Sequence, residues 1–230
     1  ISVLEALKYS AYKLGTKAEI TYLSSVDFET GKKSLKDLDT FDGILVPGGF
    51  GKTGIEGKLK VIEYARTKKI PYFGICYGMQ LAVLEYARNV LKLDSVSTEE
   101  IDPKAAHLVI GIMPEQREKL AKHDMGGTMR LGEYEAVVKK GTQAYAAYKS
   151  ATVTERHRHR YEVNPEYVDD LEAAGLVFGA TSPDGRLMEM VELPKSVHPF
   201  FLGTQFHPEL TARPLAPHPV FTAFIKAAMK

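Results

Sequence analysis

Apolar and polar residues follow the periods of helices and strands in turn along this chain. Apolar positions spaced three and four apart predict helices at residues 2–14, 56–68, 77–91, 164–174 and 220–229. Short apolar or alternating runs predict strands at residues 18–23, 43–46, 70–75, 108–112, 133–138, 156–163, 176–180, 187–193 and 200–206. Helices that alternate with strands indicate βαβ units. We therefore expect an α/β fold, an open, mostly parallel sheet with helices on both faces and additional antiparallel strands.

The pattern predicts a single domain over residues 1–230. The sequence contains no internal repeat and no low-complexity linker. Residues 114–124 are charged and lack an apolar rhythm, so we expect a surface loop there. The chain starts at Ile1 with helical spacing already established, which leads us to expect a domain excised from a longer protein.

Composition narrows the class of protein. The 230 residues are 44% hydrophobic and 26% charged, with a formal net charge of +1, so we expect no nucleic-acid partner. One cysteine excludes an internal disulfide framework and a multi-cysteine metal site, and it favours a reducing, cytoplasmic location. The sequence shows no signal peptide and no apolar run of membrane-spanning length, so no membrane partner is expected.

The most informative stretch is Gly-Ile-Cys-Tyr-Gly at residues 74–78, between a predicted strand and a predicted helix. Its spacing matches the nucleophile elbow of hydrolases, with cysteine in place of serine. The two glycines permit a sharp turn, and the helix N-terminus favours a thiolate at Cys76. An isolated free cysteine is more often a small buried apolar residue, but the paired glycines favour a nucleophile.

His207 is the candidate base for this nucleophile. It follows the predicted strand at residues 200–206, and sites in open α/β sheets gather beyond the carboxyl ends of strands. Glu209 is placed to accept a hydrogen bond from the imidazole and to fix its tautomer, while Pro208 stiffens the link. The sequence thus predicts a catalytic group of Cys76, His207 and Glu209.

An oxyanion formed during attack needs two preorganised donors. The backbone N–H of Tyr77 is one candidate, and the glycine-rich loop at residues 46–51 is placed to supply the other. Gly-Lys-Thr at residues 51–53 looks like the end of a phosphate-binding P-loop. The first glycine of that motif would fall at Val46, so we reject this interpretation.

Residues 154–164 form the densest basic run, and three interpretations compete. The near-zero net charge weakens nucleic-acid binding, and the two histidines lack further metal ligands at suitable spacing. A strand would place Arg156, Arg158 and Arg160 on one face, where an arginine can bind a small carboxylate. An ordinary solvated charged strand remains the alternative.

Three motifs resemble those of the class I glutamine amidotransferases: Leu-Val-Pro-Gly-Gly-Phe-Gly at 45–51, Gly-Ile-Cys-Tyr-Gly-Met-Gln at 74–80 and Gln-Phe-His-Pro-Glu at 205–209. Two more, at residues 126–132 and 155–164, resemble the glutaminase domains of the CTP synthase family. The resemblance extends over nearly the whole chain. It implies the class I glutamine amidotransferase-like fold.

The resemblance also implies a chemistry. In that family the domain hydrolyses L-glutamine to glutamate and ammonia. Cys76 would form a γ-glutamyl thioester, and His207 would protonate the departing ammonia and then activate water, with Glu209 orienting it. The backbone N–H groups of Gly49 and Tyr77 would bind the oxyanion.

Further residues are implied for binding glutamine: Gly49, Tyr77, Gly78, Gln80, Glu100 and Arg160. Glu100 suits the substrate ammonium and Arg160 suits its carboxylate. Glu99 is the alternative to Glu100, because the two glutamates are adjacent. Tyr77 stands where the family usually has leucine, and its phenol is expected to narrow or cover the pocket.

For the full-length enzyme the resemblance implies a homotetramer with an N-terminal synthetase domain on the same polypeptide. That domain would aminate UTP to CTP with the released ammonia, using ATP and magnesium, with GTP as activator. No cofactor and no metal are expected in the present domain. No GTP-sensing residue is assigned, because residues 114–124 do not follow a recognisable family pattern.

Other functions stay open on the sequence alone. A γ-glutamyl hydrolase shares the elbow and differs in substrate. A cysteine peptidase is a further alternative, although the local signature of papain-like enzymes is missing. A binding module that keeps the elbow only as scaffold is the third.

Overall fold

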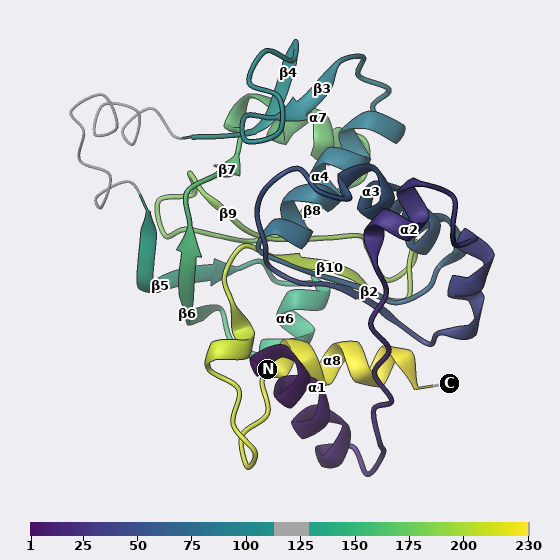
Figure 1. Cartoon of the computed structure of the whole chain (residues 1–230). Coiled ribbons are helices and arrows are strands. Elements are labelled where there is room, and N and C mark those ends of the chain that lie inside the picture. Colours follow the sequence, from purple (N-terminus) through teal and green to yellow (C-terminus); the bar gives the residue numbers. More distant parts are fainter. Residues whose placement is uncertain (113–128, 230) are drawn as a thin grey trace.

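The computed structural model describes residues 1–112 and 129–229 (Figure 1). The loop predicted at 114–124 lies outside the described residues. The helices are α1 (Ser2–Lys13), α2 (Ser25–Glu29), η1 (Leu35–Thr40), α3 (Ile55–Lys68), α4 (Tyr77–Asn89), α6 (Gln143–Tyr148), η2 (Pro165–Tyr167), α7 (Val168–Ala173), η3 (Pro208–Leu210) and α8 (Pro219–Ala228). The strands are β1 (Ile44–Val46), β2 (Tyr72–Ile75), β3 (Val96–Thr98), β4 (His107–Gly111), β5 (Arg130–Val138), β6 (Thr152–His159), β7 (Glu162–Val163), β8 (Val177–Thr181), β9 (Met188–Glu192) and β10 (Phe201–Thr204).

Seven strands form the main sheet in the order β1-β2-β10-β9-β8-β5-β6, and β3, β4 and β7 form a smaller one. β1, β2 and β10 pair in parallel, whereas each neighbouring pair from β10 to β6 is antiparallel. Strands β8, β9 and β10 follow one another through connections too short for a helical crossover, which forces antiparallel pairing. The α/β class and the additional antiparallel strands are confirmed. Parallel pairing in the described main sheet is confined to three strands, fewer than the sequence predicts.

Helices cover both faces of the main sheet, as predicted (Figure 1). Alternate residues of the central strands enter different cores because successive side chains of a strand point to opposite faces. Tyr72 and Phe201 stack at 4.7 Å in the core that contains α3 and α4. Phe73 points the other way and meets Phe221 of α8 edge-on at 5.1 Å. The first core fixes α4, and therefore its N-terminus, against the carboxyl ends of the parallel strands.

One predicted strand, at residues 18–23, is wrong. These residues connect α1 to α2 and belong to no strand in the described structure. Their alternation is real, since Ala18 and Ile20 pack against the core while Glu19 and Thr21 are exposed. The alternation therefore reflects burial of one side of an extended segment. Such burial does not require hydrogen bonds to a neighbouring strand.

The predicted strand at residues 156–163 is divided. β6 ends at His159 and β7 begins at Glu162, so Arg160 and Tyr161 lie in the break. β6 pairs with β5 in the main sheet, whereas β7 pairs with β4 in the smaller one. The break carries the chain from one sheet to the other.

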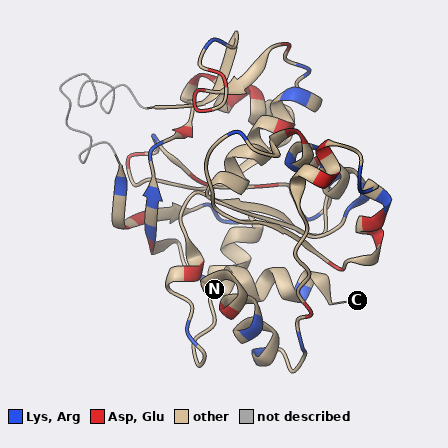
Figure 2. Cartoon of the chain, in the orientation of Figure 1, with Lys and Arg blue, Asp and Glu red and all other residues tan. Residues whose placement is uncertain are grey.

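Charged residues of both signs are interspersed over the fold (Figure 2), and most of them are exposed or partly exposed. The central strands β2 and β10 carry no charged residue. Within residues 1–112 and 129–229, no helix combines the length and apolar character needed to cross a bilayer.

Candidate active site

Cys76 occupies the turn between β2 and α4, so the predicted strand–turn–helix elbow is confirmed. Its φ of 50° and ψ of −100° lie in a region that non-glycine residues rarely adopt. The backbone N–H of Cys76 donates to the carbonyl of Thr204 at 2.6 Å, which ties the turn to β10. Backbone strain of this kind costs about 1–3 kcal/mol and is concentrated at functional sites. The thiol sits at the N-terminus of α4, where the helix dipole favours negative charge.

The two glycines of the elbow serve close packing. A Cβ on Gly78 would clash with the carbonyl oxygen of Val46, at the end of β1. A Cβ on Gly74 would lie 2.7 Å from the carbonyl carbon of Gly78. Both glycines have ordinary backbone angles, so the positive φ of the turn belongs to the cysteine itself. The glycines let α4 approach the ends of β1 and β2 while Cys76 makes the turn.

The structure brings His207 and Glu209 to this thiol. His207 follows β10, and Nδ1 of its ring lies 2.7 Å from Oε1 of Glu209. The Cys76 sulfur lies beside the same imidazole and acts on its protonation. Burial opposes protonation of the ring, but the hydrogen bonds and charges of Cys76 and Glu209 outweigh it and raise the pKa of His207 to about 10. A protonated imidazole beside the sulfur stabilises a thiolate and can serve as a general acid.

The loop after β1 lies against the elbow. β1 and β2 pair in parallel with Val46 beside Gly74, so the segments that follow both strands meet at one edge of the sheet. A Cβ on Gly48 would come 2.7 Å from Cε1 of His207, so a side chain there would displace the ring. A Cβ on Gly49 would come 3.7 Å from the ring of Tyr77. The two predicted oxyanion residues, Gly49 and Tyr77, are therefore neighbours.

Gln80 lies one helical turn after the nucleophile and is almost fully buried. Its Nε2 donates to the carbonyl of Tyr161 at 3.0 Å and to Oε1 of Gln205 at 3.2 Å. Nε2 of Gln205 lies 3.7 Å from the Cys76 sulfur, and His159 also contacts the Tyr161 carbonyl. Gln205 is not among the site residues predicted from the sequence. The signal was its position two residues before His207 in the same motif.

The two adjacent glutamates have different partners. Oε1 of Glu100 accepts from the backbone N–H of Gly51 at 2.8 Å, at the edge of the glycine loop. Oε2 of Glu99 accepts from the backbone N–H of Ile112, away from that loop. Burial, followed by the charge of Glu100, raises the pKa of the Tyr161 phenol, and Arg160 and Glu99 act on the same phenol. The assignment of the substrate ammonium to Glu100 stays a prediction, and its contact with the glycine loop supports it.

For the basic run at residues 154–164, the predicted strand with arginines on one face and histidines on the other is confirmed only up to His159. In β6 Arg156 and Arg158 are exposed, and the histidines between them are buried. Arg156 pairs with Glu133 of β5 at 3.6 Å on the surface. Arg160 was expected on the same face as these arginines. It instead lies in the break after β6, because the chain leaves the main sheet there.

Behind β6 lies a buried group of charged and titratable side chains: Arg130, His157, His159, Glu162 and Glu189. Nη2 of Arg130 lies 2.6 Å from Oε1 of Glu189, and the two histidine rings contact each other at 2.8 Å. Burial, reinforced by the Arg130 charge, lowers the pKa of His157 to about 2 and that of His159 to about 3. Burial raises the pKa of Glu162 to about 8 despite the attraction of Arg130. Both histidines are therefore neutral in the folded protein.

These histidines should make the fold acid-sensitive. An unfolded histidine takes up a proton below about pH 6.5, whereas folded His157 resists protonation down to a pKa of about 2. The contribution of these histidines to stability is then full above pH 6.5 and falls with decreasing pH, by about 1.4 kcal/mol per pH unit for each histidine. We expect His157→Gln to lower the slope between pH 6 and 4 in urea unfolding by the share of one histidine. Parallel pH profiles for the parent and the variant would contradict the assignment.

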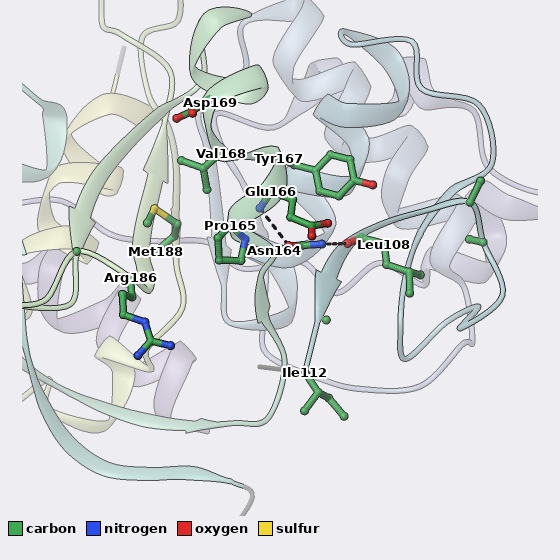
Figure 3. Close-up of a pocket in the computed structure, with 14 residues that line it drawn as sticks. Leu108, Ile112, Asn164, Pro165, Glu166, Tyr167, Val168, Asp169, Arg186 and Met188 are labelled. Atoms are coloured by element: carbon green, nitrogen blue, oxygen red, sulfur yellow. Dashed lines mark hydrogen bonds between the residues drawn. The ribbon is translucent and has the colours of Figure 1, made fainter. Parts of the chain in front are cut away.

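A cavity of about 730 Å³ lies elsewhere, between β4, the η2–α7 segment and the β8–β9 connection (Figure 3). In its wall Asn164 donates to the carbonyl of Leu108 and accepts from the N–H of Glu166. None of Cys76, His207 and Glu209 lines it.

Across the described ranges, no group of three or more His, Cys, Asp or Glu side chains is arranged to hold a metal ion. The chemistry-bearing residues thus gather at the elbow and not at the cavity.

Comparison with known proteins gives a consistent result. The family model described as class-I glutamine amidotransferase matches residues 1–227. The CTP synthases of Archaeoglobus fulgidus and Sulfurisphaera tokodaii are 50% and 51% identical to the chain, covering 100% and 99% of it. The chain spans 42% of the length of each of these curated relatives. A solved structure of the glutaminase domain of Trypanosoma brucei CTPS, with bound acivicin, is 40% identical, with a TM-score of 0.90, covering 99% of this chain and 86% of that one.

Proposed function

Because the chain belongs to the class-I glutamine amidotransferases, we propose that it hydrolyses L-glutamine to glutamate and ammonia through a γ-glutamyl thioester on Cys76. The observation that carries the proposal is the position of Cys76 at the elbow, with His207 beside it and the imidazole 2.7 Å from Oε1 of Glu209. A cysteine nucleophile needs a partner that holds or moves its proton and a third group that orients this partner. The family match and the similarity to CTP synthases over the whole chain support this chemistry.

In the first half-reaction the Cys76 thiolate attacks the side-chain amide carbon of glutamine. The carbonyl oxygen becomes an oxyanion, which receives the backbone N–H groups of Gly49 and Tyr77. The carbon–nitrogen bond then breaks, and protonated His207 gives its proton to the departing nitrogen, which leaves as ammonia. The raised pKa of His207 supports its role as this acid.

In the second half-reaction His207, now neutral, takes a proton from a water molecule. The resulting hydroxide attacks the thioester carbon, the carbon–sulfur bond breaks, and glutamate leaves with the thiolate restored. Glu209 accepts from Nδ1 of His207 throughout and so keeps its other nitrogen directed at the reacting atoms.

The remaining predicted residues hold the amino-acid end of the substrate. Glu100 takes the ammonium, Arg160 the carboxylate, and Gln80 and Gly78 line the path from them to the thiol. The support is their placement, since Glu100 contacts the glycine loop and Gln80 reaches the Cys76 sulfur through Gln205. Recognition of both charges would select free glutamine over γ-glutamyl groups of larger molecules.

We assign the chain, over residues 1–230, to the glutaminase domain of a cytoplasmic, homotetrameric CTP synthase. The ammonia would pass to an N-terminal synthetase domain of the same polypeptide, which aminates UTP to CTP with ATP and magnesium and is activated by GTP. The 42% coverage of full-length CTP synthases supports a further domain in the remainder. The proposal assigns no residue of this chain to ATP, magnesium or GTP.

Glutamine recognition can be tested through Glu100. We expect Glu100→Gln to raise the KM for glutamine at least about tenfold, because a charge-assisted hydrogen bond contributes about 1.5–3 kcal/mol. The amide oxygen of the introduced side chain can still accept from the backbone N–H of Gly51, so the contact with the glycine loop survives. Ammonia release is measured for L-glutamine and for its analogue that lacks the α-amino group.

The matched control is Glu99→Gln, which should change KM less than twofold. The parent and Glu100→Gln should differ little on the analogue without an amino group. A rise in KM confined to Glu99→Gln would move the role to that residue. Hydrolysis of γ-glutamyl peptides to glutamate and the free amine, without ammonia release from glutamine, would contradict the proposed substrate.

A further inference from the structure

The side chain of Tyr77 reaches from the first residue of α4 into the glycine loop. Its hydroxyl donates to the carbonyl oxygen of Gly51 at 2.6 Å. The residue is only 2% exposed, and burial followed by the charge of Glu100 raises the pKa of the phenol. The hydroxyl therefore keeps its proton and remains a donor throughout the neutral range.

Gly51 is held from its other side as well. Its backbone N–H donates to Oε1 of Glu100 at 2.8 Å, so two side chains from separate segments anchor the same residue. The φ of Gly51 is +82°, a value that glycine adopts without strain. Gly49, two residues earlier, lies near the Tyr77 ring, because a Cβ added there would come 3.7 Å from its Cδ1. The phenol thus binds the loop at Gly51 through its hydroxyl and lies close to Gly49.

The two anchors differ once a substrate arrives. Under the proposed function Glu100 also receives the glutamine ammonium, and a charged partner attracts a carboxylate more strongly than a backbone N–H. The Glu100 contact to Gly51 is then weakened or shared. The Tyr77 contact involves no substrate atom and persists.

We propose that Tyr77 is a positioning residue whose hydroxyl holds the glycine loop, and with it the Gly49 N–H, in place while Glu100 binds the substrate. The inference rests on the proposed function, which gives Glu100 and the Gly49 N–H their roles. It adds a side-chain role to a residue otherwise assigned only through its backbone. A leucine, which the resemblance leads one to expect at this position, has no donor and cannot make this contact.

The test compares Tyr77→Phe with Tyr86→Phe. Tyr86 lies on the same helix, is 5% exposed, and donates to the carbonyl of Ala174 at 2.7 Å, far along the helix from the elbow. The two variants therefore lose the same kind of hydrogen bond. We expect Tyr77→Phe to lower kcat about tenfold with KM changed less than about threefold, because a displaced oxyanion donor acts on the transition state. Tyr86→Phe should leave both constants within twofold of the parent.

A second readout does not depend on turnover. Amide hydrogen exchange of residues 46–53 is followed with and without saturating L-glutamate, which carries the same ammonium and carboxylate as the substrate. In Tyr77→Phe exchange of this segment should accelerate at least about threefold, and more with L-glutamate bound than without it. In Tyr86→Phe it should match the parent.

The outcomes separate this inference from the function on which it rests. Unchanged kcat and unchanged exchange in Tyr77→Phe, with a parent that releases ammonia, would overturn the positioning role alone. A parent that neither releases ammonia nor binds L-glutamate would overturn both. A higher KM at unchanged kcat would make Tyr77 a substrate-binding residue and likewise contradict the inference.

Discussion

Replacing Cys76 with alanine is expected to lower the kcat for ammonia release from L-glutamine by at least about 10⁴-fold. The chain contains one cysteine, so no other thiol can take over the attack. Alanine keeps a Cβ in the strained turn and removes only the buried sulfur, so the fold should be retained. Ammonia release is measured beside thermal unfolding of the same preparation.

Cys76→Ser is the matched control, because its hydroxyl keeps the size and polarity of the thiol but is a weaker nucleophile. Both variants should unfold within a few degrees of the parent, in line with about 1 kcal/mol or less of lost packing in a domain of this size. A folded Cys76→Ala protein that still releases ammonia at a rate near that of the parent would refute the covalent mechanism.

His207→Asn is expected to lower kcat about 10³-fold and to slow alkylation of Cys76 by iodoacetamide at pH 7. The imidazole lies beside the sulfur, and its raised pKa keeps it positively charged at that pH. Removing the positive charge therefore destabilises the thiolate and also removes the acid that protonates the departing nitrogen. Alkylation reports on Cys76 alone, because the chain has no second thiol.

Glu209→Gln separates the orientation of the His207 ring by Glu209 from the stabilisation of its positive charge. Glutamine retains an acceptor for Nδ1 of His207 but lacks the negative charge, so kcat should fall less than in His207→Asn, by about 10²-fold.

Equal alkylation rates in the parent and in His207→Asn across pH 6–9 would show that the imidazole does not stabilise the thiolate.

The elbow is predictable from sequence because its physical requirements are local. A strand, a cysteine between two glycines and a helix leave few alternative arrangements, and the two glycines leave room for α4 to pack against the ends of β1 and β2. The placement of His207 beside Cys76 follows from a general rule, since both residues come after strands that end at the same sheet edge.

Other features depend on tertiary context that periodicity does not contain. Residues 18–23 show one-sided burial but no strand pairing. Arg160 leaves the face of β6 because the chain changes sheets between His159 and Glu162. The buried partners of the β6 histidines come from β5, β7 and β9, so no local pattern signals them. Short helices such as α2 and α6 contain too few turns to show a period.

Tyr77 illustrates how structure changes the meaning of a single residue. From sequence its phenol is expected to narrow or cover the pocket. In the structure its hydroxyl donates to the carbonyl of Gly51 in the glycine loop, and the proposed positioning role rests on this contact. Only the position of Gly51 relative to α4 distinguishes these two roles.

The central claim is that Cys76 carries the γ-glutamyl group. The most direct measurement is peptide mapping by mass spectrometry after treatment with a chloroketone analogue of glutamine, with ammonia release followed in parallel. We expect one label per chain on Cys76, prevention of labelling by L-glutamine, and loss of ammonia release in proportion to labelling. Labelling of another residue, or full ammonia release from protein whose Cys76 is completely labelled, would contradict it.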